Sequence, residues 1–179
     1  IDLGGGMGIS YNNKENQLNI NKYAKVVNKF IRNKNVKIIF EPGRFLVGNT
    51  AVLITKILYI KKNINKSFII LDAGMNDLMR PALYDAKHEI IPIVKNKKLI
   101  KKNIEFVGPV CETSDKFLNI KNFPKVKEGE FVCLTNVGAY GMSLSSNYNM
   151  RPLIAEIMVS GSSHRIIRKR QSLQNLIKN

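Results

Sequence analysis

The chain has 179 residues, 44% of them hydrophobic and 23% charged, which suits a folded core and argues against wholesale disorder. It has no apolar run of the roughly 18 residues that a membrane span needs, and residues 1–6 lack the basic start of a signal peptide. The formal charge is +16, from 29 basic and 13 acidic residues. Because 22 of the basic residues are lysines scattered among asparagines and isoleucines, we expect solvated loops and no nucleic-acid interface.

Cysteine and histidine are scarce. Cys111 and Cys133 are too few for a disulfide scaffold or a four-cysteine zinc site, so we expect a reducing, cytoplasmic setting and no metal. Cys133 lies in an apolar run and is expected to be buried. His88 and His164 stand far apart, and we expect surface or interdomain roles for them. Because the sequence does not begin with methionine, we expect a portion of a longer protein.

The first quarter of the chain has the pattern of an α/β unit. Residues 1–3 are predicted to end a buried strand, and the glycine-rich residues 4–8 to form the loop after it. Asn19 is a suitable N-cap for a helix over residues 20–33, where apolar side chains recur at helical spacing. Residues 36–40 form a continuous apolar run, typical of a strand buried on both faces. Strand, loop, helix and strand in this order predict one βαβ unit.

The remaining sequence is richer in β-branched residues separated by turn residues. Short helices are predicted around residues 76–84 and 172–177. Strands are predicted over residues 45–60, 67–72, 89–94, 103–110, 130–134 and 153–159. These strands predict an all-β domain with a closed or sandwiched sheet, and a domain boundary near residue 45.

Two motifs in the first part could bind a phosphate-bearing cofactor. Residues 4–8 are Gly-Gly-Gly-Met-Gly, whose amides can converge on an anion, although a plain tight turn remains open. They match neither the dinucleotide fingerprint nor a P-loop. Residues 41–44 are Glu-Pro-Gly-Arg. They place a carboxylate and a guanidinium together at the end of the strand predicted over residues 36–40, or form a salt-bridged turn. Together they favour a cofactor with a phosphate and a basic ring nitrogen.

Three later motifs could contact a substrate. Arg80 and Tyr84 would project from one helix face and could hold a carboxylate, or simply form a surface helix. Cys111 could donate a proton while Glu112 binds an ammonium group, since neither a metal set nor a cysteine-protease pair is in place. Tyr140 lies between small residues and could contact a ring or phosphate, or belong to an ordinary turn.

These motifs, in this order, resemble the diaminopimelate decarboxylases, pyridoxal-phosphate enzymes of the alanine racemase-like fold. Related ornithine and arginine decarboxylases share the glycine loop and the Glu-Pro-Gly-Arg turn, whereas the Arg-Pro-Ala-Leu-Tyr and Cys-Glu-Thr-Ser-Asp forms are similar to the diaminopimelate branch. The matching stretches cover the chain from end to end: residues 4–8, 41–44, 72–77, 79–84, 111–115, 138–141 and 146–152.

The resemblance implies an α+β fragment: residues 1–45 as the last strands of a (β/α)8 barrel, and residues 46–179 as a C-terminal all-β domain, Greek-key or barrel-like. It implies that Cys111 protonates the carbanion left by carbon dioxide, and that Glu41 pairs with the pyridinium nitrogen. The implied pyridoxal 5′-phosphate ligands are Gly5, Gly6, Glu41, Pro42, Gly43, Arg44 and Tyr140. The implied substrate ligands are Arg44, Arg80, Tyr84, Glu112 and Tyr140.

The activity implied by the resemblance is decarboxylation of meso-2,6-diaminopimelate to L-lysine and carbon dioxide, the last step of lysine biosynthesis. Cys111 and Glu112 would serve the partner subunit's active site, which implies a homodimer. Members of the family are more than twice as long, and their Schiff-base lysine and ring-stacking histidine precede the matching region. We therefore expect a C-terminal portion, running to or near the natural C-terminus and inactive alone.

Two alternatives stay open. The first is a related decarboxylase that acts on ornithine, arginine or lysine, which a substrate panel on the full-length protein would identify. The second is a non-catalytic basic module that binds nucleic acid, whose affinity would fall steeply with salt.

Overall fold

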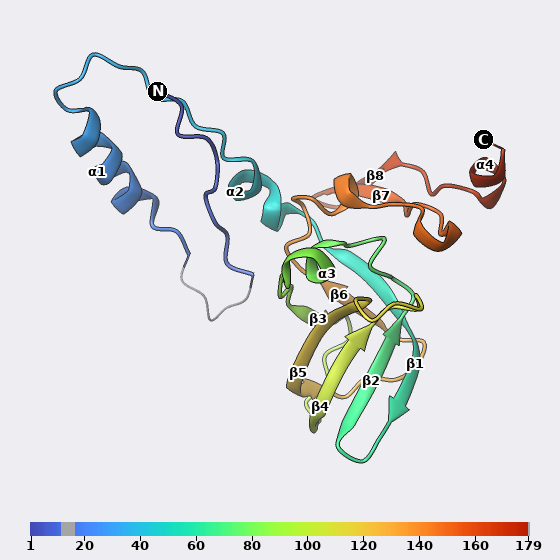
Figure 1. Ribbon diagram of the computed structural model, residues 1–179. Helices are drawn as coiled ribbons and strands as arrows, with labels where there is room; N and C mark the ends of the chain where they lie inside the picture. The colour runs from blue at the N-terminus through green and yellow to red at the C-terminus, as the bar shows by residue number, and fades with distance from the viewer. Residues whose placement is uncertain (12–16, 179) are drawn as a thin grey trace.

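The computed structural model describes residues 1–11 and 17–178. Figure 1 shows an N-terminal arm that carries helix α1 and stands away from a sheet domain, with helix α2 at the junction. Among the described residues, no helix is long and apolar enough to span a membrane. The core consists of side chains from Leu53 onward, so the sheet domain contains the described hydrophobic core.

The arm has the predicted order of strand, helix and strand. Helix α1 spans Ile20–Ile31, and the Asn19 side chain accepts a hydrogen bond from the Lys22 amide, which confirms the predicted cap. On either side of it two extended segments run parallel, with Leu3 N donating to Ile39 O at 3.0 Å and Ile39 N donating to Ile1 O at 3.0 Å.

The predicted burial of this second segment is wrong for the described chain. The pairing amounts to an isolated bridge between Asp2 and Ile39, and Ile39 and Phe40 are 54% and 40% exposed. A central parallel strand is buried by neighbours on both faces, whereas this segment contacts helix α1, with the Tyr23 and Phe40 ring centroids 6.0 Å apart, and its side chains stay largely exposed.

The segment after the arm is helical before it becomes a strand. Helix α2 spans Gly43–Val47 and the 3-10 helix η1 spans Gly48–Thr50, so the expected strand over residues 45–60 begins only at Leu53. An apolar run this short does not distinguish a helix from a strand by its periodicity.

Six strands form one curled sheet in the order β3-β6-β1-β2-β4-β5. All neighbouring pairs are antiparallel except β2 with β4. Strand β5 lies in a region for which no strand was predicted. The strands are β1 Leu53–Lys62, β2 Lys66–Leu71, β3 Ile90–Pro92, β4 Leu99–Val107, β5 Lys116–Pro124 and β6 Phe131–Leu134.

Alternating burial along the strands produces the core. In β1 the side chains of Leu53, Thr55 and Ile57 are buried while those between them are exposed, which is the period of a strand with one covered face. Across the sheet, the Phe106 and Phe123 rings meet edge to face with centroids 4.9 Å apart. Cys133 is buried here as predicted.

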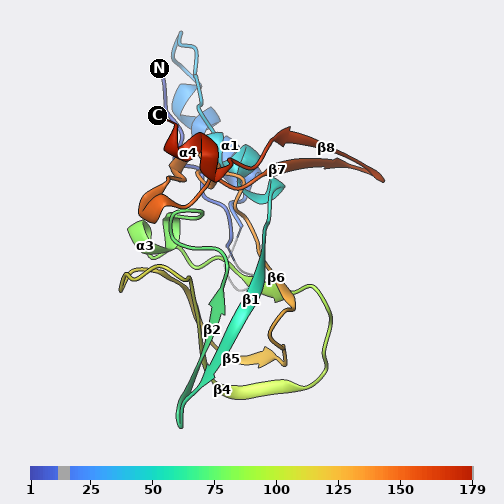
Figure 2. The ribbon, with the colours of Figure 1, turned by 90° about the vertical axis from the view of Figure 1, so that its right-hand side faces the viewer.

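The remaining elements surround one end of the sheet. Helix α3 spans Arg80–Tyr84, with Pro81 in its first turn, and the 3-10 helices η2 and η3 span Met142–Leu144 and Tyr148–Met150. Strands β7 (Glu156–Ser160) and β8 (Ser163–Arg168) form a separate hairpin that stands off the sheet in Figure 2. Helix α4, Leu173–Ile177, confirms the expected C-terminal helix and is capped by Ser172.

Candidate active site

The glycine loop and the Glu-Pro-Gly-Arg turn lie against each other. The Glu41 amide donates to the Gly4 carbonyl at 2.8 Å, and a Cβ added to Gly5 would come within 2.5 Å of the Glu41 carbonyl oxygen. Only a glycine permits this approach without a shift of the backbone. The two motifs that were predicted to share a cofactor are therefore neighbours.

The loop itself has the features of an anion cradle. Gly4 and Gly6 have φ angles of +62° and +75°, and a Cβ added to either would meet no atom within 4 Å. Among the described residues, the amides of Gly5 and Gly6 donate no hydrogen bond. Free amides beside open space that a side chain would fill are suited to phosphate oxygens, so these residues fit a phosphate-bearing cofactor.

Close backbone packing joins the segment that carries Tyr140 to helices α2 and η1. A Cβ on Gly138 would lie 1.9 Å from the Val47 carbonyl oxygen, and the Gly138 amide donates to Gly48 O at 3.0 Å. The next residues turn sharply, with Tyr140 at a φ of +62°. Such strain in a non-glycine residue persists where the surroundings determine the conformation, and it is common at functional sites.

Arg80 lies inside a cluster of tyrosines. Its guanidinium carbon is 5.3 Å from the ring centroids of Tyr84 and Tyr140 and 5.8 Å from that of Tyr11. Arg80 is 7% exposed, and its Nε has no hydrogen-bond partner in the described part of the chain. A buried cation between aromatic faces, with a donor still unpaired, is suited to an anionic group of a ligand. The predicted pairing of Arg80 and Tyr84 on one helix face is confirmed.

His88 is fully buried, so the surface role is wrong, whereas its contacts with Tyr11 of the arm and Thr135 of the sheet domain fit the interdomain alternative. Its Nδ1 lies 2.9 Å from the Thr135 carbonyl, and its ring meets that of Tyr11 edge to face at 4.9 Å. Burial lowers the pKa of His88 below 6.5, and the charge of Arg80 lowers it further, against the hydrogen bond to Thr135. A neutral imidazole with Nδ1 protonated, donating to this carbonyl, is the consistent state.

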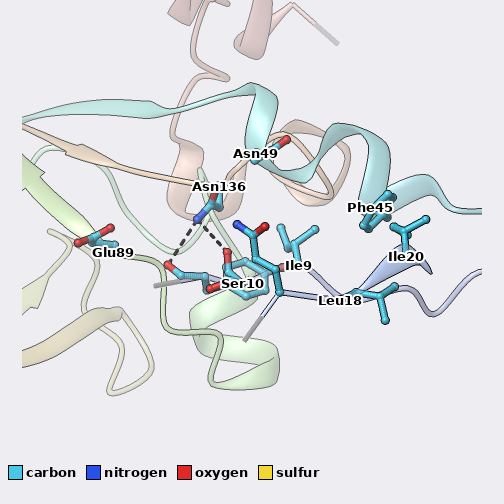
Figure 3. Close-up of a pocket in the computed structure, with 11 residues that line it drawn as sticks. Ile9, Ser10, Leu18, Ile20, Phe45, Asn49, Glu89 and Asn136 are labelled. Atoms are coloured by element: carbon cyan, nitrogen blue, oxygen red, sulfur yellow. Dashed lines mark hydrogen bonds between the residues drawn. The ribbon is translucent and has the colours of Figure 1, made fainter. Parts of the chain in front are cut away.

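A pocket of about 400 Å³ lies beside the glycine loop. Figure 3 shows Asn136 donating to the carbonyl oxygens of Ser10 and Tyr11, both at 3.4 Å, with Glu89 and Phe45 at opposite ends. The pocket is not lined by Glu41, Arg80 or Tyr140. Because it is lined by residues 8–11, 17–18 and 20 on one side and by Glu89 and Asn136 on the other, it marks where the arm packs on the sheet domain.

Cys111 and Glu112 occupy an exposed loop between β4 and β5. The loop is organised by buried Asp115, whose carboxylate accepts hydrogen bonds from the amides of Val110 and Met75, both at 2.7 Å. Burial raises the pKa of Asp115, and these two hydrogen bonds oppose the rise. Asp115 thus fixes the backbone of the loop by hydrogen bonds, while the Cys111 side chain is exposed.

The loop is also contacted by a residue to which the sequence assigned no role. Tyr148 donates a hydrogen bond to the Glu112 carboxylate. This hydrogen bond is the main cause of a raised Tyr148 pKa. The only indication in the sequence was that Tyr148 lies within residues 146–152, a matching stretch in which no residue was assigned a function.

Arg151 holds the segment around Tyr148 in place. Its Nε donates to Asn76 Oδ1 at 2.8 Å, and its Nη2 donates to the Asp72 carbonyl at 2.5 Å and lies 3.3 Å from the Asp77 carboxylate.

Within the described ranges, no group of three or more histidine, cysteine, aspartate or glutamate side chains could hold a metal ion.

The family described as "Pyridoxal-dependent decarboxylase, C-terminal sheet domain" matches residues 11–138. The match covers most of the chain and most of the sheet domain. The chain belongs to the pyridoxal-dependent decarboxylases. The implied cofactor is pyridoxal 5′-phosphate, and the free amides of the open glycine loop fit its phosphate.

Curated relatives of this decarboxylase chain are diaminopimelate decarboxylases. The protein from Zymomonas mobilis is 42% identical over 99% of this chain, and that from Neisseria meningitidis serogroup B is 44% identical over the full length of this chain. The chain covers 42% of each of these two relatives.

Solved decarboxylase structures agree with the fold. Diaminopimelate decarboxylase from Helicobacter pylori, complexed with L-lysine, is 43% identical and matches 98% of this chain and 43% of its own with a TM-score of 0.89. A lysine/ornithine decarboxylase from Vibrio vulnificus shares the fold at a TM-score of 0.72 and 22% identity.

The predicted site residues form three sets, according to the contacts that join them. The first is the glycine loop with the turn at residues 41–44, and the second is Arg80 with Tyr84 and Tyr140. The third is Cys111 with Glu112. Among the described residues, no hydrogen bond or ion pair joins the predicted site residues of one set to those of another.

Proposed function

We propose that the protein containing this chain decarboxylates meso-2,6-diaminopimelate to L-lysine and carbon dioxide, the last step of lysine biosynthesis. The observation that carries the proposal is the buried Arg80 guanidinium, surrounded by three tyrosines, one of which, Tyr140, belongs to the segment packed against α2 and η1. A decarboxylase of simple diamino acids needs no such cation, whereas diaminopimelate carries a second carboxylate. Relatives named diaminopimelate decarboxylase support the same substrate.

The chain's own residues then divide the work. The amides of the glycine loop and the Arg44 guanidinium hold the phosphate, and Glu41 holds a proton at the ring nitrogen. Pyridoxal phosphate, when bound, supplies the electron sink for the pair left by departing carbon dioxide. Arg80 and Tyr84 bind the distal carboxylate, and Glu112 binds the distal ammonium group. The Cys111 thiol returns the proton to the carbon that lost its carboxylate.

The architecture of the whole protein is part of the proposal. Residues 1–45 would complete a (β/α)8 barrel, supported by their parallel strand–helix–strand order, and residues 46–179 would form the C-terminal domain. We also propose a homodimer with shared active sites, in which the exposed Cys111 and Glu112 serve the partner subunit's site. A cytoplasmic location is supported by the two free cysteines.

The test uses the full-length protein with pyridoxal phosphate and a panel of amino acids. We expect carbon dioxide release from meso-diaminopimelate and L-lysine formation in equal amounts. Release from ornithine, arginine or lysine in preference to diaminopimelate would overturn the substrate assignment. A protein that releases no carbon dioxide but binds DNA with salt-dependent affinity would overturn the enzyme assignment.

A further inference from the structure

We propose that Tyr148 is a positioning residue that orients the Glu112 carboxylate toward the distal ammonium group of the substrate, and so contributes to substrate selectivity. The inference rests on the proposed function, in which Glu112 binds that group. It begins from the hydrogen bond that the Tyr148 hydroxyl donates to Glu112 Oε1. Oε2 of Glu112 has no hydrogen-bond partner among the described residues and remains available as an acceptor.

Both loops are anchored to one turn of the chain. On the Glu112 side, Asp115 accepts the Met75 amide at 2.7 Å. On the Tyr148 side, the Ser146 amide donates to the Asn76 carbonyl at 3.0 Å, and Arg151 Nε donates to Asn76 Oδ1 at 2.8 Å. The phenol and the carboxylate are exposed side chains, yet the backbone beneath each is tied to neighbouring residues of a single turn. Their pairing is therefore a property of the fold.

The backbone next to Tyr148 has a strained conformation that hydrogen bonds hold in place. Asn149 and Met150 have φ angles of +53° and +57°, a left-handed conformation that costs a non-glycine residue about 1–2 kcal/mol. Asn147 opposes this strain by donating to the Arg151 carbonyl at 2.8 Å and to Gln171 Oε1 at 2.6 Å. Strained residues held by several hydrogen bonds are a usual feature of segments that fix a functional side chain.

The chemistry of a phenol is suited to this task. A tyrosine donates a hydrogen bond without carrying a positive charge, so it orients the Glu112 carboxylate and leaves its negative charge for an incoming ammonium group. Among the described residues, no lysine, arginine or histidine pairs with Glu112. The hydrogen bond raises the pKa of Tyr148, which keeps the hydroxyl protonated.

The test is a double-mutant cycle in the full-length holoenzyme with Tyr148→Phe, Glu112→Ala and the combined variant. Two substrates are compared: meso-diaminopimelate and 2-aminopimelate, which keeps both carboxylates but lacks the distal amine. For diaminopimelate we expect Tyr148→Phe to raise KM by about 5–10-fold with kcat within about twofold. With 2-aminopimelate, or in the Glu112→Ala background, the same substitution should change KM by less than about twofold.

The matched control is Tyr59→Phe, the same chemical change at a tyrosine exposed on β1. It should leave KM for both substrates unchanged. Equal losses for both substrates, or effects that add in the combined variant, would overturn the positioning role. So would an unchanged KM in Glu112→Ala, since there would be no interaction to orient. Each of these results leaves carbon dioxide release from diaminopimelate intact, whereas an inactive wild-type holoenzyme removes the proposed function as well.

Discussion

Glycine at position 6 is required by backbone conformation and by the space in front of it. Its φ of +75° strains any other residue by about 1–2 kcal/mol, and a methyl group there would occupy the cradle proposed for phosphate. We expect Gly6→Ala to weaken pyridoxal phosphate binding by on the order of tenfold. Gly161→Ala, at a φ of +58° in the distant β7–β8 turn, has comparable strain and should leave cofactor affinity unchanged in the same absorbance titration.

Arg80 cannot be replaced by lysine without loss, although the charge is kept. Lysine lacks the planar fork that contacts the three tyrosine rings and presents donors to a carboxylate. We expect Arg80→Lys to lower kcat/KM for diaminopimelate by about 10–100-fold, mainly through KM. Steady-state kinetics of the holoenzyme measure this, with Arg32→Lys at the exposed end of α1 as the control. An unchanged KM would remove Arg80 from the substrate site.

His88 should make stability sensitive to acid. Because its folded-state pKa is lowered below 6.5, the unfolded state binds more protons as the pH falls through and below this value. The free energy of unfolding should therefore decrease in that direction, by at most about 1.4 kcal/mol per pH unit from this group. Urea unfolding of the full-length protein at pH 7.5 and about 5.5 tests this. The His88→Gln variant should lose less unfolding free energy than the wild type between these two pH values. An equal loss would contradict the view that protonation of buried His88 destabilises the fold.

Among the elements, the turn containing Asn76 and Asp77 is hydrogen-bonded to the segment that carries Tyr148 and lies next to Met75, which binds the loop that carries Glu112. Arg151→Ala would leave the Asp77 carboxylate, 2% exposed, without its cation, and would remove the donor to buried Asn76. We expect a loss of on the order of 2–3 kcal/mol in unfolding free energy. Arg168→Ala breaks the exposed ion pair with Glu156 and should cost less than about 1 kcal/mol. Equal costs in urea unfolding would mean that burial of the first pair contributes nothing.

Elements with strong local signals were predictable. The Asn19 cap and the apolar spacing after it define α1, and the alternation in β2 defines a half-covered strand. Strand β5 was missed because charged and polar residues interrupt it, and its burial depends on β4 beside it. Residues 45–50 were assigned to a strand because a short apolar run carries no distinguishing period.

At the scale of the whole molecule, hydrophobicity did not predict which apolar residues are covered. The described core is confined to residues from Leu53 onward, while the apolar residues at the end of the arm, such as Ile39, stay largely exposed. Burial is a property of neighbouring elements, and composition alone does not report it. The same holds for His88, for which the sequence left a surface and an interdomain position open, and which is fully buried against Tyr11 of the arm.

The order of the motifs and the residues within them were enough to predict the decarboxylase family, its cofactor and the residue types of the site. Decarboxylation with pyridoxal phosphate needs particular side chains, and these motifs contain them. The tertiary structure decided which groups meet. Tyr11, Tyr84 and Tyr140 surround Arg80 from three separate segments, and Tyr148 reaches Glu112 across 36 positions of sequence. Such pairings depend on close backbone approaches such as that of Gly138 to Val47, and on loops that are hydrogen-bonded to a shared turn. Local sequence patterns carry no record of these distances.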